Sequence, residues 1–330
     1  MKISNQNIPF DGEKLRKVTL TYGGAETPTK TADNTTSNGV PCRDPFIMLY
    51  GDKYYLYQGV VRTDPESWDS SAITCRVSDD LELWSDPIVV YEPPKNFHGI
   101  KHKFWAPECH YYKGNFYIFT SCWSNITDTH AISVYRADNP LGPFEDIAGG
   151  VITPKTWHAI DGTLYIDDDN QPWMIFVKEW VGAPDKIGSF VGAMLSEDFT
   201  HFISEPEHMF YANEPSWTDD RVTDGVYIFK TDDKKLGMIW SNYAKNGYVI
   251  GVAYSDSGLI EGPWSHEETL LYERDLLSGL KYDGGHGMIF PKKEGGFAIV
   301  FHSPNKVEED WSCARIVIRD LSFEDGIKIK

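Results

Sequence analysis

The sequence predicts an all-β fold, a five-bladed β-propeller formed by a single domain over residues 1–330, and three observations support this. One hairpin pattern recurs five times at intervals of about 50–65 residues, which is the spacing of propeller blades. Each copy is a hydrophobic strand, a turn of charged residues or glycine, and a second strand rich in aromatic residues. Helical signals are weak, because no long apolar stripe follows a 3.6-residue period.

The five hairpins supply the first two strands of each blade in chain order. They occupy residues 43–57, 105–119, 159–176, 223–240 and 285–300. Third strands of the first four blades are expected at residues 72–78, 131–137, 190–196 and 249–255, and a last strand near 314–319 completes the fifth blade. Residues 1–40 are expected to form an arm ahead of the blades, with one candidate closing strand at 17–22.

Composition narrows the classes of function. The formal net charge of −18 repels phosphate backbones, which argues against a nucleic-acid partner. No stretch approaches the 18 or so apolar residues of a membrane span, so no membrane partner is expected. The first residues are polar and lack the apolar region of a signal peptide, which favours a cytoplasmic location.

Polar residues stand near the start of the first strand in every predicted blade. They are Asp44, Glu108, Asp161, Asp224 and His286. Because the first strands of a propeller line its central channel, we expect these side chains to converge on one axis. Hydrolysis of a glycosidic bond needs one carboxylate as base or nucleophile and one protonated carboxyl as acid, and a third carboxylate raises the pKa of the acid.

Several short segments resemble glycoside hydrolase family 43, whose members are five-bladed propellers acting on arabinose-, xylose- and galactose-containing glycans. The segments are Arg43-Asp44-Pro45-Phe46, Phe104-Trp105-Ala106-Pro107-Glu108, Ala159-Ile160-Asp161-Gly162, Gly284-Gly285-His286-Gly287 and Phe301-His302-Ser303-Pro304-Asn305. Each segment alone is a weak signal, but their order and their positions in successive blades are specific. The resemblance covers about residues 40–305.

The resemblance implies roles for the carboxylates. Asp44 matches the general base, which activates water for displacement with inversion, and Asp161 matches the residue that tunes and orients the acid. The acid departs from the family pattern of Glu-Gly-Pro, because the fourth blade opens with Asp224-Gly225-Val226. Either Glu214, in the connection between blades three and four, or Asp224 at the standard place is the proton donor. Glu214 is favoured here for its longer reach and its neighbouring Pro215.

Other residues are candidates for binding. Trp105 is expected to stack on a sugar ring, with Trp157, Trp180 and Trp217 as alternatives that are more often core residues. Glu108 is a candidate for a hydrogen bond to a sugar hydroxyl. Arg43 is a second candidate for contacting the substrate, and it is also a plausible ion-pair partner of Glu108. The resemblance also implies a Ca²⁺ ion beside His286, although a lone histidine is a weak calcium signal.

The leading hypothesis is therefore an inverting, exo-acting glycosidase that removes terminal arabinose, xylose or galactose units from oligosaccharides. One alternative is a propeller that binds glycans or proteins and has lost its general acid, as the departure at Asp224 suggests. Another is a related enzyme that retains configuration. The separation of the two carboxyls distinguishes inversion from retention, at roughly 6.5–9.5 Å against about 5–5.5 Å.

Overall fold

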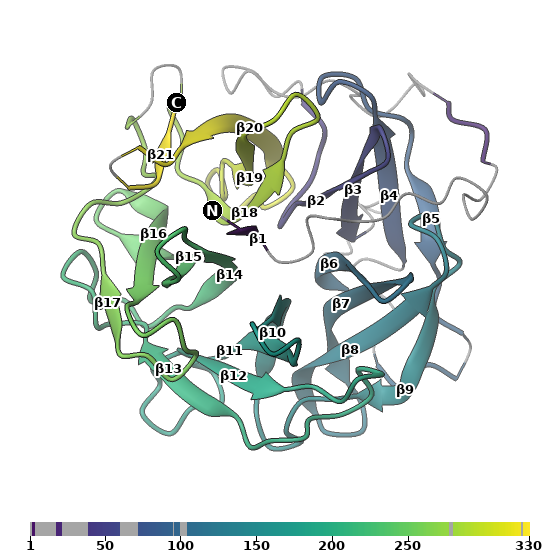
Figure 1. The fold of residues 1–330 in the computed structure, drawn as a ribbon, viewed down its shortest axis with the longest axis horizontal. Helices are drawn as coiled ribbons and strands as arrows, with labels where there is room; N and C mark the ends of the chain where they lie inside the picture. The colour runs from purple at the N-terminus through teal and green to yellow at the C-terminus, as the bar shows by residue number, and fades with distance from the viewer. Residues whose placement is uncertain are drawn as a thin grey trace.

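The computed structural model describes residues 2–3, 18–21, 39–59, 72–94, 96–99, 104–276, 280–324 and 326–330, and the statements below concern these residues. They form five antiparallel sheets around a central axis, which confirms the predicted all-β propeller (Figure 1). Within this described part of the chain there is no α-helix. None of the described residues forms a helix that is long and apolar enough to cross a bilayer.

Each blade is a meander in which consecutive strands are neighbours. Blade 1 contains β2 (Phe46–Tyr50), β3 (Lys53–Gly59), β4 (Ile73–Ser78) and β5 (Ile88–Tyr91). Blade 2 contains β6 (Trp105–Tyr112), β7 (Asn115–Ser124), β8 (Thr129–Ala137) and β9 (Glu145–Val151). Blade 3 contains β10 (Ala159–Ile166), β11 (Pro172–Lys178), β12 (Ser189–Met194) and β13 (Glu207–Tyr211). Blade 4 contains β14 (Asp224–Lys230), β15 (Leu236–Ala244), β16 (Gly247–Ser255) and β17 (Trp264–His266). Blade 5 contains β18 (Gly285–Pro291), β19 (Phe297–Ser303), β20 (Arg315–Ser322) and β21 (Lys328–Ile329).

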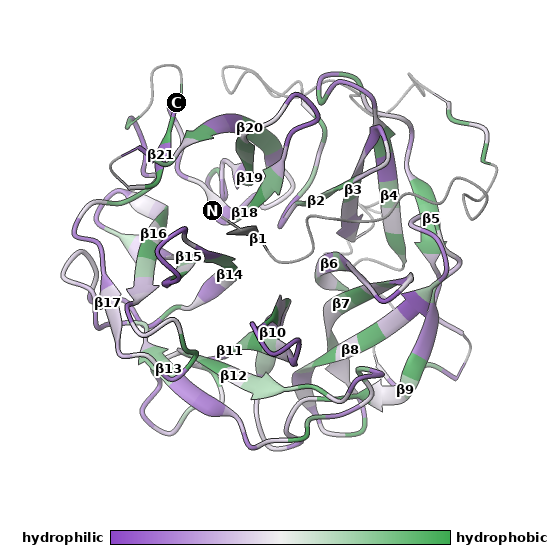
Figure 2. Ribbon diagram, in the orientation of Figure 1, coloured by the Kyte–Doolittle hydropathy of each residue, from purple (hydrophilic) through white to green (hydrophobic). Residues whose placement is uncertain are grey.

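The hydrophobic core lies between the faces of neighbouring blades. One cluster joins blades 3 and 4 around Trp173, Phe210 and Trp240, and a second joins blades 2 and 3 around Phe119 and Phe199. A third and larger cluster runs from blade 1 into blades 2, 4 and 5. Figure 2 shows hydrophobic residues along the strands and many hydrophilic residues in the loops between them. The first strands are buried on both faces, and seven of the eight residues of β10 are buried, so these strands lack a polar alternation.

The ring is closed by a segment that directly precedes blade 1. The amide of Cys42 donates to the carbonyl of Ala314, and the amide of Ile316 donates to the carbonyl of Val40, so residues 40–42 run beside the start of β20. The candidate closing strand at 17–22 is wrong, because residues 18–21 form no strand and residues 17 and 22 lie outside the described part. Strand β1 (Lys2–Ile3) pairs instead with β14 on its axis side.

A backbone feature shared by all five blades positions the channel residues. Within two positions of the start of each first strand lies a residue with φ between 43° and 56°, namely Asp44, Ala106, Asp161, Gly225 and His286. In blades 2 to 5 the pairing of the first two strands shifts register at this residue. A bulge of this kind re-aims side chains, and left-handed residues other than glycine are costly and gather at functional sites. Three of these five residues have ionisable side chains.

Candidate active site

Three side chains from blades 1, 3 and 5 meet where the first strands begin. The Nδ1 atom of His286 lies 3.2 Å from Oδ1 of Asp44 and 3.8 Å from Oδ2 of Asp161. The Asp44 side chain is 17% exposed, whereas that of Asp161 is 5% exposed. Asp44 is thus the carboxylate of this pair that solvent or a ligand reaches, and Asp161 lies beneath the surface.

Asp44 is surrounded by groups that keep its carboxylate charged. Burial alone would raise the pKa of Asp44, but the neighbouring His286 and Arg43 outweigh it and hold that pKa below its ordinary value. Arg43 is fixed by Asn305, since its Nη1 donates to the carbonyl oxygen and its Nη2 to the side-chain Oδ1, both at 2.8 Å. An ionised, partly exposed carboxylate is the form that a general base requires.

His302 supports Asp44 from behind as a neutral ring. Burial and the charge of Arg43 lower the pKa of His302 to about 3. The backbone amide of Asp44 donates to Nδ1 of His302 at 3.2 Å, which requires that nitrogen to be unprotonated. Nε2 of the same ring faces Oδ1 of Asn305 at 3.3 Å. The tautomer of this ring therefore follows from its two hydrogen bonds, and the ring fixes the backbone of the strand start.

The pKa values of Asp161 and Asp224 are shifted in the opposite direction from that of Asp44. Burial and the negative charge of Asp44 raise the pKa of Asp161 well above its ordinary value. Burial and the charge of Asp161 do the same to the pKa of Asp224. Oδ2 of Asp161 accepts a hydrogen bond from the Gly225 amide at 3.0 Å, so Asp161 also anchors the start of the fourth blade beside Asp224.

Asp224 is the first residue of β14. It directly precedes the left-handed Gly225, is half-buried, and accepts a hydrogen bond from the hydroxyl of Tyr248 at 3.1 Å. The Tyr248 ring is stacked on His302 at a centroid distance of 5.8 Å, so one contact chain joins the surroundings of Asp224 and Asp44. A half-exposed carboxyl with a raised pKa is protonated near neutral pH and can donate a proton.

Glu214 does not join this cluster, in contrast to the expectation that its connection folds over the channel. Its Oε1 accepts a hydrogen bond from the backbone amide of Tyr211 at 2.8 Å, and Tyr211 ends β13, the outermost strand of blade 3. The side chain is exposed, and its charge acts on His266 of β17, which is the outer strand of blade 4. The hydrogen bond ties Glu214 to the rim of the ring, away from Asp44 and Asp161.

Glu108 is buried and follows the bulge of its strand by two residues. The bulge of blade 2 is at Ala106, so Trp105 and not Glu108 opens the strand. Glu108 is 5% exposed and pairs with Nε2 of His110 at 2.9 Å rather than with Arg43. It therefore faces a buried partner, while its charge contributes to the raised pKa of Asp161.

The aromatic candidates have different surroundings. Trp105 is half-buried and lies against His130 at a centroid distance of 4.4 Å. Trp217 is partly buried and packs on Trp240 beside the core between blades 3 and 4. Trp157 lies under the ammonium of Lys178 at 4.2 Å. Trp180 is half-buried.

The expected calcium beside His286 finds little support in the side chains around it. Among the described residues, the one group of three or more ligating side chains close enough to share a metal ion is His130, His158 and Glu179, which does not include His286. Nδ1 of His286 is already engaged by Asp44. Calcium prefers six to eight oxygen ligands, which this histidine-centred arrangement does not supply. No catalytic step below depends on such an ion.

Sequence reasoning did not single out several residues that shape the site. Tyr248, Asn305 and Ser241 are examples, and Ser241 accepts a hydrogen bond from the His286 amide through its Oγ at 2.8 Å. Asn305 ends the segment Phe301-His302-Ser303-Pro304-Asn305, so that segment was the available signal for His302 and Asn305. Tyr248 and Ser241 lie on β16 and β15 and carry no motif of their own.

A five-bladed propeller with an ionised carboxylate and a protonated carboxyl at the starts of its first strands has the architecture of a glycosidase. The chain belongs to glycosyl hydrolases family 43, whose profile matches residues 36–326. The expected family and enzyme class are thereby confirmed, and a carbohydrate is its substrate.

Individual relatives share this family. A crystal structure of an endo-arabinase from Bacteroides thetaiotaomicron is 31% identical, with 91% of this chain and 99% of that chain covered and a TM-score of 0.75. A structure of an endo-1,4-beta-xylanase from the same organism is 25% identical, covers 93% and 97%, and has a TM-score of 0.72. An extracellular exo-alpha-(1->5)-L-arabinofuranosidase of Cellvibrio japonicus is 30% identical over 159 residues, which is 43% of this chain and 42% of that relative.

Proposed function

We propose that the protein is an inverting glycosidase in which Asp44 is the general base and Asp224 the general acid. The observation that carries this proposal is that the pKa values of two partly accessible carboxyls, at the first strands of blades 1 and 4, are shifted in opposite directions. The pKa of Asp44 is lowered and that of Asp224 is raised well above its ordinary value. Pairs of carboxyls whose surroundings push their pKa values apart are the usual division between base and acid.

Each residue then has a defined task. Ionised Asp44 takes a proton from a water molecule as that water attacks the anomeric carbon. Protonated Asp224 gives its proton to the glycosidic oxygen, so that the sugar leaves as a neutral alcohol. Asp161 holds the start of the fourth blade through the Gly225 amide and raises the pKa of Asp224, so that the two carboxyls do not ionise independently. His286 and Arg43 keep Asp44 ionised.

Although the side chain of Asp224 is shorter than the usual Glu, Asp224 still provides a carboxyl that can act as the general acid. Family members usually carry Glu at this place, and the non-catalytic alternative was based on that departure. The supporting geometry is that Asp224 keeps its position before the bulge at Gly225, its raised pKa and its hydrogen bond from Tyr248. A carboxyl that is shorter by one methylene requires the leaving group to approach the strand start more closely, which restricts the leaving groups that the enzyme accepts.

Oligosaccharides of α-1,5-linked arabinofuranose are the proposed substrates. The support is that the 31%-identical structure is an endo-arabinase and that the curated relative from Cellvibrio japonicus acts on α-1,5-linked arabinofuranose. Xylan fragments are the second candidate, because the 25%-identical structure is an endo-1,4-beta-xylanase. Relatives of both endo and exo type are present, so the exo action expected from the sequence stays a prediction.

A substrate and product experiment tests this function. Aryl α-L-arabinofuranosides, β-D-xylosides and β-D-galactosides are compared first, and the arabinofuranoside should have the highest kcat/KM. Arabino-oligosaccharides are then hydrolysed in an NMR tube, where the first-formed sugar should be the β-anomer if the α-linkage is cleaved with inversion. A first-formed α-anomer would show retention, and a preference for xylosides would move the substrate assignment to xylan. Release of single arabinose units alone would support exo action.

A further inference from the structure

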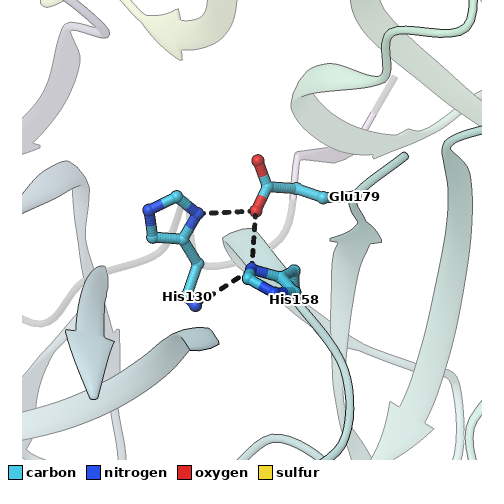
Figure 3. Close-up of side chains that lie close together, drawn as sticks. All are labelled: His130, His158 and Glu179. Atoms are coloured by element: carbon cyan, nitrogen blue, oxygen red, sulfur yellow. Dashed lines mark hydrogen bonds and ion pairs between the residues drawn. The ribbon is translucent and has the colours of Figure 1, made fainter. Parts of the chain in front are cut away.

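A second group of ionisable side chains lies between blades 2 and 3, apart from the three carboxylates of the catalytic mechanism. His130 is near the start of β8, His158 directly precedes β10, and Glu179 directly follows β11. Figure 3 shows the two imidazole rings turned toward the same carboxylate oxygen. Three segments that are distant in the sequence thus bring two imidazoles and one carboxylate together.

The donor atoms are close enough to share one ion. Nδ1 of His130 lies 2.7 Å and Nδ1 of His158 lies 3.9 Å from Oε2 of Glu179. One ligating atom from each of the three residues lies within 4.8 Å of the others. Bonds of about 2.0–2.2 Å from zinc to nitrogen and oxygen place neighbouring ligand atoms of a tetrahedral site slightly more than 3 Å apart. Adjustments of less than about 1 Å would therefore bring these atoms to ligating distances.

The surrounding structure already fixes both imidazole rings. The His130 ring is held between Trp105 and Trp123, at centroid distances of 4.4 and 5.0 Å. The Glu179 amide donates to the His158 carbonyl at 2.9 Å. Gly182 leaves room for the His158 ring, since a Cβ atom at position 182 would lie 2.7 Å from its Cδ2 atom. Side chains that are held in this way lose little freedom when they bind a ligand.

The carboxylate of Glu179 is buried and needs a positive partner. Its side chain is 6% exposed, and it forms ion pairs with the two imidazoles, which are 13% and 17% exposed. A buried carboxylate is stabilised by a cation.

We propose that His130, His158 and Glu179 form a binding site for a divalent transition-metal ion, with Zn²⁺ as the best match. Two imidazoles and one carboxylate are a ligand set that zinc accepts, with a fourth position left for water or another ligand. Calcium and magnesium prefer oxygen ligands and do not match two nitrogen donors. The partial exposure of both histidines gives an ion a path from solvent. On binding, Nδ1 of His158 would release its long 3.4 Å contact with the His130 amide.

The test measures Zn²⁺ binding directly and needs no activity assay. Purified, chelator-treated protein is titrated with Zn²⁺ against a chromophoric chelator, and wild type should bind one ion in this competition. Glu179→Gln and His158→Gln should each weaken binding by about 100-fold or more, because even the loss of groups that only support metal ligands costs about 10–100-fold. His201→Ala is the matched control, since His201 is exposed and lies outside the cluster, and it should bind like wild type.

One further variant tests the site without removing a ligand. Gly182→Ala should push the His158 ring aside and weaken Zn²⁺ binding, while circular dichroism confirms that each variant is folded. Replacement of Zn²⁺ by Co²⁺ should give visible absorption bands in wild type that are lost in Glu179→Gln. The proposal is overturned if wild type binds no Zn²⁺, or if folded Glu179→Gln and His158→Gln both bind it as tightly as wild type. Neither outcome bears on the roles of Asp44 and Asp224.

Discussion

Asp44 and Asp224 carry the same functional group at the heads of two first strands, but different neighbours act on them. His286 and Arg43 face Asp44 and hold its pKa down, whereas Asp161 faces Asp224 and raises its pKa together with burial. The same residue type therefore fills two roles, because the chain places a cation beside one carboxyl and an anion beside the other. Sequence comparison supplied the positions of these aspartates, and the structure supplied their partners.

Replacement of Asp44 by Asn should abolish turnover while the protein stays folded. The amide cannot take the proton of the attacking water, and the loss of a general base typically costs about 10²–10⁴ in rate. The measurement is kcat on an aryl arabinofuranoside, with circular dichroism as the control for folding. Activity within a factor of about three of wild type would remove Asp44 from the mechanism.

Replacement of Asp161 by Asn should shift the alkaline side of the pH–activity profile to lower pH. Asp161 is the charge that contributes most to the raised pKa of Asp224, so its loss lowers the pKa of the acid and deprotonates it earlier as pH rises. The acidic side should stay in place, because the lowered pKa of Asp44 results from His286 and Arg43. A profile of unchanged shape and position would make Asp161 purely structural.

The same substitution should increase stability at neutral pH relative to wild type. The native pKa of Asp161 lies well above the value of about 3.9 for an unfolded chain. The stability contributed by its protonated form is complete below the unfolded pKa and is lost as pH rises through the native pKa. The Tm difference between Asp161→Asn and wild type should therefore grow from pH 4 to pH 8. A difference that shrinks over this range would contradict the raised pKa.

At the scale of the elements, one left-handed residue near the start of the first strand, repeated in five blades, accounts for the site. The residue in the left-handed region is Asp44, Asp161 or His286 in three blades, and Gly225 in the fourth, where Asp224 stands one position earlier. In the second blade the bulge falls at Ala106, and the polar residue Glu108 follows it by two positions and pairs with His110. Hairpin patterns in the sequence do not reveal where a bulge falls.

Replacement of Gly225 by Ala should remove activity and destabilise the protein more than the same change at Gly114. Both glycines have positive φ, which costs a residue with a Cβ atom about 1–2 kcal/mol. At Gly114 a Cβ atom meets nothing within 4 Å, but at Gly225 it would lie 2.6 Å from Cα of His286. Thermal unfolding and kcat compare the two variants. Equal losses of stability would contradict the close contact of blades 4 and 5.

Glu214 shows the limit of sequence reasoning about connections. Its neighbours Asn213 and Pro215 gave a Glu-x-Pro-like element that invited an active-site role. In the structure, Glu214 accepts a hydrogen bond from the amide of Tyr211 at the end of β13, and this bond holds the connection at the outer rim. The local sequence does not show whether this connection packs on the outer rim or folds over the channel. The position of Asp224 at a strand start, in contrast, follows from the blade pattern.

At the scale of the whole molecule, the sequence predicted the ring but not its closure. The hairpin repeat determined the number of blades, because each copy must bury both faces against its neighbours. The closing contact is made by the short segment at residues 40–42, which pairs with the start of β20 and has no recognisable strand pattern. The cluster of His130, His158 and Glu179 was also not predicted, since its members come from three separate segments without a shared motif.

The central claim is that Asp224 is the proton donor at the head of the fourth blade. The most direct measurement compares kcat/KM of Asp224→Asn on an arabino-oligosaccharide and on an aryl arabinofuranoside with a good leaving group. A natural sugar leaving group needs protonation, whereas an activated phenol does not. We therefore expect kcat/KM to fall by about 10²–10⁴ on the oligosaccharide and by far less on the aryl substrate. Glu214→Gln should behave like wild type on both. Equal losses for Asp224→Asn on both substrates, with the selective loss appearing in Glu214→Gln, would contradict the account.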